Sequence, residues 1–219
     1  MAFKLQFVPA LHPEGRPFIA ISAVATLVFF LLWQPLGWLG VLLTAWCAYF
    51  FRDPERFPPQ GEGVLVSPAD GVVLSVGTAP LPPELEGMSG ERVRISIFMN
   101  VFNVHVNRVP EAGEITDVKY IPGAFINASL DKASEDNERN LIRMTTAAGD
   151  DLVFVQIAGL VARRIVCTAE AGDAVGRGER VGIIRFGSRV DVYLPTSFES
   201  AVREGQTMIA GETVVARRA

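Results

Sequence analysis

Several reactive side chains are scarce in this sequence. The 219 residues include only two cysteines, two histidines and three lysines. Two cysteines cannot build a disulfide scaffold, and the familiar zinc sites need three or four Cys or His ligands. Cys47 lies in an apolar stretch and Cys167 in a strand-like run, so neither has the surroundings of a metal ligand or a redox pair. We therefore expect no metal site.

The scarcity of lysine excludes further classes. Lys119 falls in an expected strand and Lys132 in a polar loop, whereas a biotin or lipoyl carrier presents its lysine at a hairpin tip. A pyridoxal-phosphate enzyme also needs a suitable lysine, for its internal Schiff base. The Gly-x-Ser-x-Gly elbow of serine hydrolases is absent from the sequence. The net charge of −4 and the pI of about 5.3 argue against a nucleic-acid partner.

Charge is missing altogether from residues 17–51, a run of 35 residues. One membrane-spanning helix needs about 20 apolar residues, so this run is long for one helix and short for two. The sequence Gln-Pro-Leu-Gly at 34–37 is typical of a helix break. We predict two short apolar helices, 18–33 and 38–51, forming a hairpin that attaches the protein to a membrane. Whether the hairpin spans the bilayer or is re-entrant stays open.

Basic residues flank both ends of the apolar run. Lys4 and Arg16 precede it, and Arg52 and Arg56 follow it. A hairpin with both ends in the cytoplasm shows this pattern. We expect a bacterial inner-membrane protein whose remaining chain lies on the cytoplasmic side.

From residue 57 onward the sequence is typical of a mainly β domain. The stretch 57–61 is a Pro-rich linker, and β-branched segments of five to eight residues then alternate with Gly, Pro or Asp turns. We therefore divide the chain into a membrane-associated segment, 1–56, and a β-rich domain, 57–219, in which 127–140 is a polar loop or short helix. The expected strands are 63–67, 71–76, 92–99, 104–109, 115–121, 141–146, 152–158, 161–168, 182–186, 190–194 and 213–216.

An internal repeat refines the fold prediction. Residues 171–181 match residues 204–214 at an offset of 33, with coincident glycines, glutamates and valines in a Gly-x-x-Val-x-x-Gly-Glu-x-Val pattern. The pattern predicts a tight turn, an inward apolar residue, a second turn and a strand. It resembles the paired hairpins of biotinyl/lipoyl-type barrels. We expect an interlocked β-barrel or sandwich behind the apolar hairpin.

Three short stretches contain the candidates for chemistry: 67–71, 98–110 and 185–189. The first holds Asp70 in a Pro/Gly turn, the second holds His105 among Asn and Arg, and the third holds the chain's one Gly-Ser dipeptide at 187–188. Each also has a structural interpretation. An acidic residue is common in turns, a lone histidine is often structural, and glycine commonly just makes a turn.

Taken in order, the motifs resemble the phosphatidylserine decarboxylases, in their short, single-histidine subclass. The resemblance covers nearly all of 64–196 and includes the apolar block in front. The matching motifs are PADG at 68–71, FNVHVNRVP at 102–110, YIPG at 120–123, NERN at 137–140 and FGS at 186–188.

The resemblance implies a self-processing enzyme. Its Gly187–Ser188 bond would be cut by the protein itself, giving a large chain, 1–187, and a small chain, 188–219, that stay together as a heterodimer. Ser188 would become a pyruvoyl group, the cofactor, and would form a Schiff base with the amine of phosphatidylserine in the membrane. Loss of CO₂ would then give phosphatidylethanolamine. An assembly larger than this two-chain unit is also compatible with the sequence.

The resemblance also implies roles for other residues. His105 would be the acid/base of decarboxylation, because an ordinary histidine pKa of about 6.5 suits proton transfer near neutrality. Asp70 would orient or activate groups during self-cleavage. Longer members have a second histidine at the position of Arg108, and Leu-Gly-Ser-Thr where this chain has Phe-Gly-Ser-Arg. The base for self-cleavage is therefore either His105, acting in both steps, or Asp70. By its charge, Arg108 is a candidate for binding the substrate phosphate or carboxylate.

Two alternatives remain from the sequence. A membrane-anchored barrel acting as a non-enzymatic adaptor or carrier would fit the repeat and the hairpin, but it leaves PADG, His105 and the Gly-Ser pair unexplained. A pyruvoyl-dependent decarboxylase of another amine would explain those residues, but the apolar block favours a lipid substrate.

Overall fold

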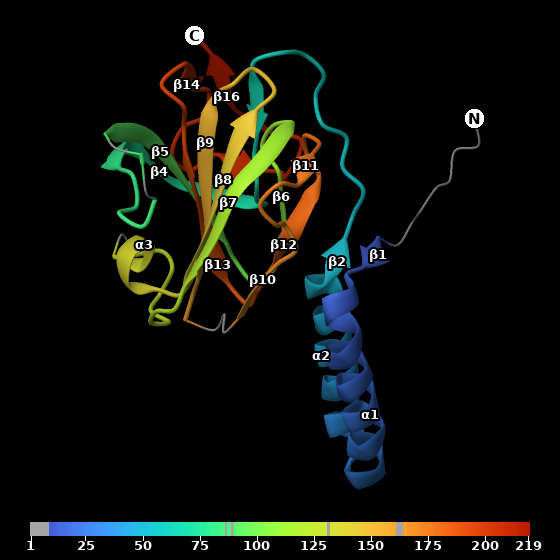
Figure 1. Ribbon diagram of the computed structural model, residues 1–219. Helices are drawn as coiled ribbons and strands as arrows, with labels where there is room; N and C mark the ends of the chain where they lie inside the picture. The colour runs from blue at the N-terminus through green and yellow to red at the C-terminus, as the bar shows by residue number, and fades with distance from the viewer. Residues whose placement is uncertain (1–8, 86, 89, 131, 161–163) are drawn as a thin grey trace, which may run out of the picture. The chain divides into compact units, whose positions relative to one another are not determined.

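A computed structural model describes residues 9–85, 87–88, 90–130, 132–160 and 164–219. The chain divides into two compact units, Met1–Glu55 and Arg56–Ala219 (Figure 1). Each unit is described by itself below.

The first unit is a helical hairpin. A single 3₁₀ turn, Pro13–Gly15, leads into α1 (Arg16–Leu32), which α2 (Gln34–Phe50) follows after one extended residue, Trp33. Two short strands, β1 (Ala10–Leu11) and β2 (Arg52–Asp53), pair across its open end. The predicted start of the second helix at residue 38 is wrong by four residues. Pro35 lies in the first turn of α2, where its missing N–H is not needed, so it starts the helix rather than breaking it.

Small and polar residues let the two helices approach closely. A Cβ on Gly37 would lie 2.2 Å from the Phe30 ring, and one on Gly40 would lie 2.8 Å from the Thr26 hydroxyl. The hydroxyls of Thr26 and Thr44 are 3.0 Å apart and form an interhelical hydrogen bond. Close backbone approach and hydroxyl pairs of this kind hold helices together where the hydrophobic effect does not.

The outer surface of the hairpin is apolar. Leucine, valine, isoleucine and tryptophan side chains are exposed along both helices, among them Leu31 at 87% and Ile21 at 69%. Among the described helices, the segment Pro13–Leu32 is long and apolar enough to cross a membrane. These features are compatible with membrane association.

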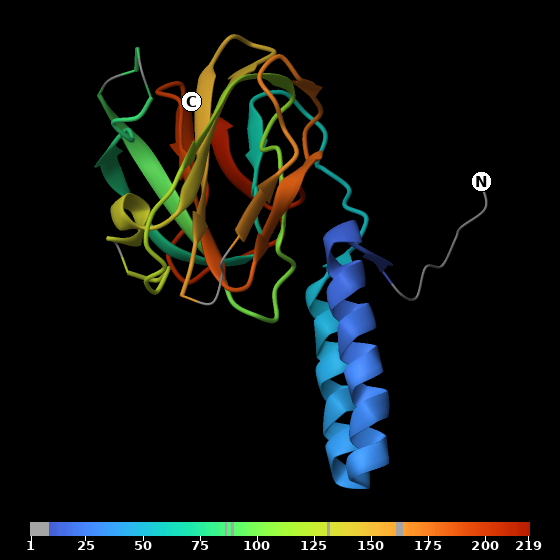
Figure 2. The same cartoon turned by 60° about the horizontal axis from the view of Figure 1, so that its bottom comes forward.

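The second unit is mainly β, as predicted, and its largest sheet has eight strands that curl around one side of the unit (Figures 1 and 2). In spatial order these are β11 (Ala174–Val175), β7 (Gly113–Ile121), β8 (Arg139–Thr146), β9 (Asp151–Ala158), β13 (Ser188–Tyr193), β5 (Glu91–Met99), β4 (Gly71–Pro80) and β15 (Thr207–Met208). Two three-stranded sheets complete the unit: β10 (Arg164–Cys167), β12 (Arg180–Arg185) and β6 (Val106–Arg108), and β14 (Phe198–Ser200), β16 (Val214–Arg218) and β3 (Val64–Val66).

Most expected strands are present, with shifted ends. The polar stretch 127–140 contains a single helical turn, α3 (Ala133–Asp136). Strands β11, β14 and β15 were not predicted, because two or three residues are too few to show an alternating pattern. The expected strand 161–168 is observed as β10, and its first three residues lie outside the described residues.

The central strands β9 and β13 of the eight-stranded sheet are buried on both faces. On β9, Phe154 belongs to the main core, which fills the space between the large sheet and the two smaller ones, whereas its neighbours Val153 and Val155 belong to a second cluster under α3. Successive strand residues point to opposite faces, so one strand supplies both cores. Burial on both faces explains why the sequence of β9 is a nearly continuous run of apolar residues.

The 33-residue repeat is a structural repeat. Strands β11 and β15 occupy equivalent positions, and the turns that follow them place Gly178 and Gly211 at the same φ of +76°. A Cβ on Gly178 would lie 3.6 Å from the Cα of Gly211, so the two turns pack directly against each other. This contact between the two hairpins confirms the interlocked arrangement.

Candidate active site

Ser188 is the first residue of β13, a strand whose six residues are all buried. Strand β13 pairs with β5 on one side and β9 on the other, and Ser188 lies opposite both Met99 and Ala158. Its side chain is fully buried on the main-core side of the sheet, with Oγ 4.0 Å from Met99 Sδ. The Gly187–Ser188 bond thus lies where a loop enters a central strand.

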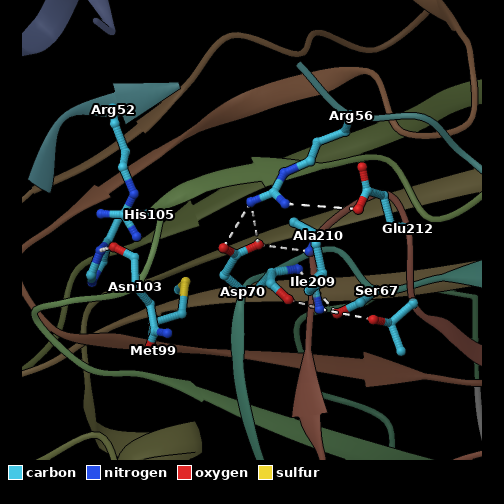
Figure 3. A network of polar contacts seen from close by, with 12 residues as sticks. Arg52, Arg56, Ser67, Asp70, Met99, Asn103, His105, Ile209, Ala210 and Glu212 are labelled. Atoms are coloured by element: carbon cyan, nitrogen blue, oxygen red, sulfur yellow. Dashed lines mark hydrogen bonds and ion pairs between the residues drawn. The ribbon is translucent and has the colours of Figure 1, made fainter. Parts of the chain in front are cut away.

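His105 contacts Gly187, the residue before Ser188. Its Nε2 accepts a hydrogen bond from the Gly187 amide at 3.2 Å, and its Nδ1 is 3.1 Å from the carbonyl oxygen of Asn103, seen beside the ring in Figure 3. Because a carbonyl can only accept, Nδ1 carries the proton and Nε2 is the basic nitrogen. The ring is fully buried. The structure therefore brings His105 and the Gly187–Ser188 pair together.

The carbonyl of Gly187 packs against a second glycine. A Cβ on Gly159 would lie 2.4 Å from the Gly187 oxygen, so only glycine allows this approach. Gly187 itself has a φ of +67°, a conformation that favours glycine. Both residues border a cavity of ≈ 270 Å³, whose other walls come from Phe98 and from residues 100–101, 127–128, 160 and 186. The cavity gives a small molecule space beside the bond.

Asp70 is held on the turn between β3 and β4 by nitrogen donors. Arg56 Nη2 donates to both carboxylate oxygens, at 3.1 and 2.9 Å, and the Ala210 amide donates to Oδ1 at 2.7 Å. Figure 3 shows Arg56 between Asp70 and Glu212, whose Oε2 is 3.9 Å from Nη1. The carboxylate is thus fixed in orientation. Strand β5 links Asp70 to Ser188, because Gly71 starts the strand on one side of β5 and Ser188 the strand on the other.

Arg108 is buried in the body of the domain. Arg108 is only 4% exposed, and its Nη1 donates to the Gly178 carbonyl at 2.8 Å. Its Cδ would lie 3.1 Å from a Cβ on Gly211. These contacts with both repeat turns indicate a role in joining them. Substrate binding by Arg108 stays a prediction, and the proposal below does not depend on it.

Sequence reasoning missed an ion pair next to Ser188. Arg189 forms a buried pair with Asp191, with Nε–Oδ1 at 2.5 Å, and donates to Ser96 Oγ at 2.8 Å. Its Nη1 also donates to the Leu130 carbonyl, which belongs to the loop before α3. Burial, followed by the nearby Asp191 charge, raises the pKa of Tyr193 to about 12. Arg189 thus anchors the start of β13 on the sheet face opposite the Ser188 side chain.

The comparisons with known proteins agree on one family. The family model described as phosphatidylserine decarboxylase matches residues 43–216. A phosphatidylserine decarboxylase proenzyme from Ruegeria pomeroyi is 56% identical over 216 residues, covering 99% of both chains. Proteins of the same name from Cereibacter sphaeroides and Paramagnetospirillum magneticum are 57% and 55% identical, covering 96% and 94% of this chain and 90% and 86% of their own.

The chain belongs to the phosphatidylserine decarboxylase family. It is therefore a decarboxylase, a carboxy-lyase, and the alternative of a non-enzymatic adaptor is wrong.

Two motifs of this decarboxylase have structural roles that the sequence did not reveal. A Cβ on Gly123 of YIPG would lie 2.5 Å from the backbone of Asn137 in NERN, so the two motifs pack together. The side-chain Nδ2 of Asn137 donates to the Ala158 carbonyl at 2.6 Å. Ala158 lies opposite Ser188 on the neighbouring strand.

Asn140, the last residue of NERN, begins a buried chain of amides. Its Nδ2 donates to Gln156, and Gln156 donates to Asn107 Oδ1 at 2.9 Å. Asn107 Nδ2 lies 3.6 Å from the sulfur of Met99, which is the residue opposite Ser188. The only signal available in the sequence was that polar residues interrupt apolar strands, and that signal does not say which of them meet.

Proposed function

We propose that this decarboxylase cuts its own Gly187–Ser188 bond, converts Ser188 into a pyruvoyl group and uses that group to convert phosphatidylserine into phosphatidylethanolamine. The observation that carries the proposal is the 3.2 Å hydrogen bond between the Gly187 amide and His105 Nε2 at the start of β13. This contact supports the proposal because the basic nitrogen of the buried imidazole lies beside Gly187, one residue before Ser188.

Self-cleavage needs a base near the Ser188 hydroxyl. In the proposed first step His105 Nε2 exchanges its hydrogen bond with the Gly187 amide for one from Ser188 Oγ and takes the Oγ proton as Oγ adds to the Gly187 carbonyl carbon. The C–N bond then breaks as His105 returns that proton to the Ser188 nitrogen, which leaves an ester and a free amine. Loss of the Ser188 Cα proton releases Gly187 as a carboxylate, and water replaces nitrogen in the remaining dehydroalanine with release of ammonia. His105 then serves both steps, and Asp70 orients the turn and β4 beside them.

The surroundings of residue 188 suit such a group. The position is buried, directly follows Gly187, which borders the cavity, and is fixed by β5, β9 and the Arg189–Asp191 pair. Once formed, the pyruvoyl carbonyl would supply the electron sink that loss of CO₂ requires. His105 would deliver the proton that replaces the carboxylate.

The strand pairing supports a stable two-chain product. The small chain, 188–219, contains β13 between β5 and β9, β15 on β4, and β16 on β3. All four partner strands belong to the large chain, 1–187. Cutting one loop would therefore leave four strand pairings to hold the heterodimer together.

The apolar hairpin supports a membrane substrate. Its exposed apolar surface would keep the enzyme at the bilayer, where both acyl chains of phosphatidylserine remain. The basic flanks favour an inner-membrane location with the catalytic domain on the cytoplasmic side. This placement favours the lipid over another amine as the substrate.

Denaturing intact-mass measurement of the purified protein tests the proposal. The wild type should give two chains that meet at residue 188, with a blocked small chain, and Ser188→Ala should give one unbroken chain. The purified wild type should release CO₂ from phosphatidylserine. A wild-type protein that releases CO₂ as one unbroken chain would overturn the pyruvoyl mechanism.

His105→Ala separates the two bases. If His105 serves both steps, the variant stays unbroken, and His12→Ala, the matched histidine control in the other unit, cleaves normally. A His105→Ala chain that cleaves fully but releases no CO₂ would assign the first step to another base, with Asp70 the next candidate. Full activity would remove His105 from the mechanism.

A further inference from the structure

Three loops carry large apolar side chains on the exterior of the second unit, Arg56–Ala219, which we call the catalytic unit. Phe102 is 61% exposed, Leu130 is 52% exposed and Leu160 is 65% exposed. We call these three residues the apolar rim. They come from the loop before β6, the loop before α3 and the loop after β9, which are distant in sequence.

The three rim residues lie on loops that line the cavity next to Gly187. Leu160 lines that cavity, Phe102 directly follows its wall residue Val101, and Leu130 lies two residues after its wall residue Ala128. The loop before β6 and the loop that contains Gly187 lie at the same end of the large sheet (Figure 2). The exposed apolar side chains therefore gather at the mouth of the candidate active site.

Two of the loops are held by their own asparagines. Asn100 Oδ1 accepts from the Phe102 amide at 2.8 Å, and Asn103 Oδ1 accepts from the Asn100 amide at 2.9 Å. In the other loop, Asn127 Oδ1 accepts from the Ser129 amide at 3.0 Å, and the Asn127 carbonyl accepts from the Leu130 amide at 3.0 Å.

These hydrogen bonds matter for the partner that the rim fits. Backbone amides satisfied within a loop carry a smaller desolvation cost when the loop leaves water. The loops thus present apolar side chains on turns whose amides are already paired. Aromatic and aliphatic side chains displayed in this way suit the boundary between lipid head groups and acyl chains.

We propose that the apolar rim is a membrane-docking surface, in which Phe102, Leu130 and Leu160 insert into the bilayer around the lipid whose head group enters the cavity. The inference rests on the proposed function, because a phosphatidylserine substrate must reach residue 188 while its acyl chains stay in the bilayer. It assigns to the catalytic unit a membrane contact of its own, in addition to the helical hairpin.

The full-length chain with two substrates tests the docking surface. One substrate is phosphatidylserine in phosphatidylcholine vesicles, and the other is dihexanoyl-phosphatidylserine, supplied as monomers. In the double variant Phe102→Gln/Leu130→Gln, kcat/KM should fall about tenfold on vesicles and stay close to the wild-type value on the monomers. Phe57→Gln is the matched control, because Phe57 is 80% exposed but lies in the linker.

Each other outcome is informative. Complete self-cleavage by intact mass shows that the double variant has folded. Equal losses on both substrates would make the rim part of the catalytic site, and no loss on either would leave it without a docking role, so both overturn the inference. A change in the oligomeric mass of the variant would identify the rim as an interface between copies of the chain. A wild-type enzyme inactive on both substrates would instead defeat the proposed function.

Discussion

The catalytic unit contains two halves of the same design, and the candidate chemistry is divided between them, with Asp70 in the half of β4 and His105 in the half of β7. Strand β4 starts at Gly71 after the turn Pro-Ala-Asp-Gly, and β7 starts at Gly113 after the turn Pro-Glu-Ala-Gly, 42 residues later. Gly71 pairs with Met208 and Gly113 with Val175, which are equivalent positions of the 33-residue repeat. Both strands also carry a register shift two residues further on.

The eight-stranded sheet shows the same symmetry. Its order reads β11-β7-β8-β9 from one edge and β15-β4-β5-β13 from the other. The halves therefore meet between β9 and β13, the strand that begins with Ser188. Where two matched positions hold different types of residue, the backbone fold that the halves share does not require either type.

The candidate residues occupy such positions. At the offset of 42, Asp70 matches Ala112, His105 matches Gly63 and Asn107 matches Leu65. Each functional candidate is polar in one half and small or apolar in the other. The fold can therefore be built without these polar groups, which argues that they are present for chemistry.

Ser188 itself has a counterpart, Asp150, in the half that contains β7, β8 and β9, which we call the closed half. Val72 matches Glu114 at the offset of 42. Phe98 lies opposite Val72 and Thr145 lies opposite Glu114, so Phe98 matches Thr145. The next residue, Met99, which is the partner of Ser188, therefore matches Thr146. The amide of Thr146 donates to the carbonyl of Asp150, which ends the tight turn between β8 and β9. One half thus closes the strand pair with a short hairpin, whereas the other brings in β13 from a distant loop at Gly187.

Replacing Asp70 by its counterpart should have the largest effect. Asp70→Ala removes the acceptor of Arg56 and of the Ala210 amide, yet Ala112 shows that alanine fits this turn. We expect a folded protein whose self-cleavage is slower by about 100-fold or more. Intact mass followed over time after expression measures the rate.

Two further variants sharpen this result. Asp70→Asn keeps an oxygen for the Ala210 amide and removes the charge, so it separates orientation from charge. Glu111→Gln changes the acidic residue of the matched turn, whose partner is Arg177 at 2.7 Å, and should leave self-cleavage unchanged. Wild-type cleavage in Asp70→Ala would make Asp70 a structural residue.

The two strand-starting glycines should behave alike, because the fold requires both. A Cβ on Gly71 would lie 2.1 Å from the Phe98 oxygen, and one on Gly113 would lie 2.1 Å from the Thr145 oxygen. Each Gly→Ala variant should lose about 3 kcal/mol of unfolding free energy through overpacking. Thermal unfolding measures the loss, and Gly77→Ala, where a Cβ has open space, is the control. A large loss in only one half would show that the two are not built alike.

Converting Asn107 into its counterpart should cost less. Asn107→Leu leaves the buried Gln156 amide without its acceptor, a penalty of about 1–3 kcal/mol. The double variant Asn107→Leu/Gln156→Leu removes both groups and should recover part of the stability lost. Chemical denaturation of the single and double variants measures the difference. Equal stability of wild type and Asn107→Leu would contradict the importance of this hydrogen bond.

The order of motifs along the chain was enough to single out Gly187, Ser188 and His105 as candidates, because each lies in a short local pattern. The interlocked fold followed from a repeat whose glycines need a positive φ. Gly159 and Arg189 could not be found in this way, because their roles depend on which strands become neighbours. The two halves were visible only in part, since the turns at 68–71 and 110–113 share just proline and glycine at matched positions. Register, which sequence alone does not give, revealed the rest.

Replacing Asp150, the counterpart of Ser188, should have the smallest effect, and that effect is on stability. Burial alone would raise the pKa of Asp150, but hydrogen bonds from Ser197 and Arg218 outweigh it and lower the pKa. A carboxyl group with a lowered folded-state pKa stabilises the fold above its unfolded pKa of about 3.9, and this contribution is lost as the pH falls through the folded pKa. Asp150→Asn should therefore cost about 1 kcal/mol at pH 7, and this difference should shrink to nothing in acid. Thermal unfolding of both proteins across that pH range measures it; a constant difference would mean that Asp150 acts through the shape of the closed hairpin rather than through its charge.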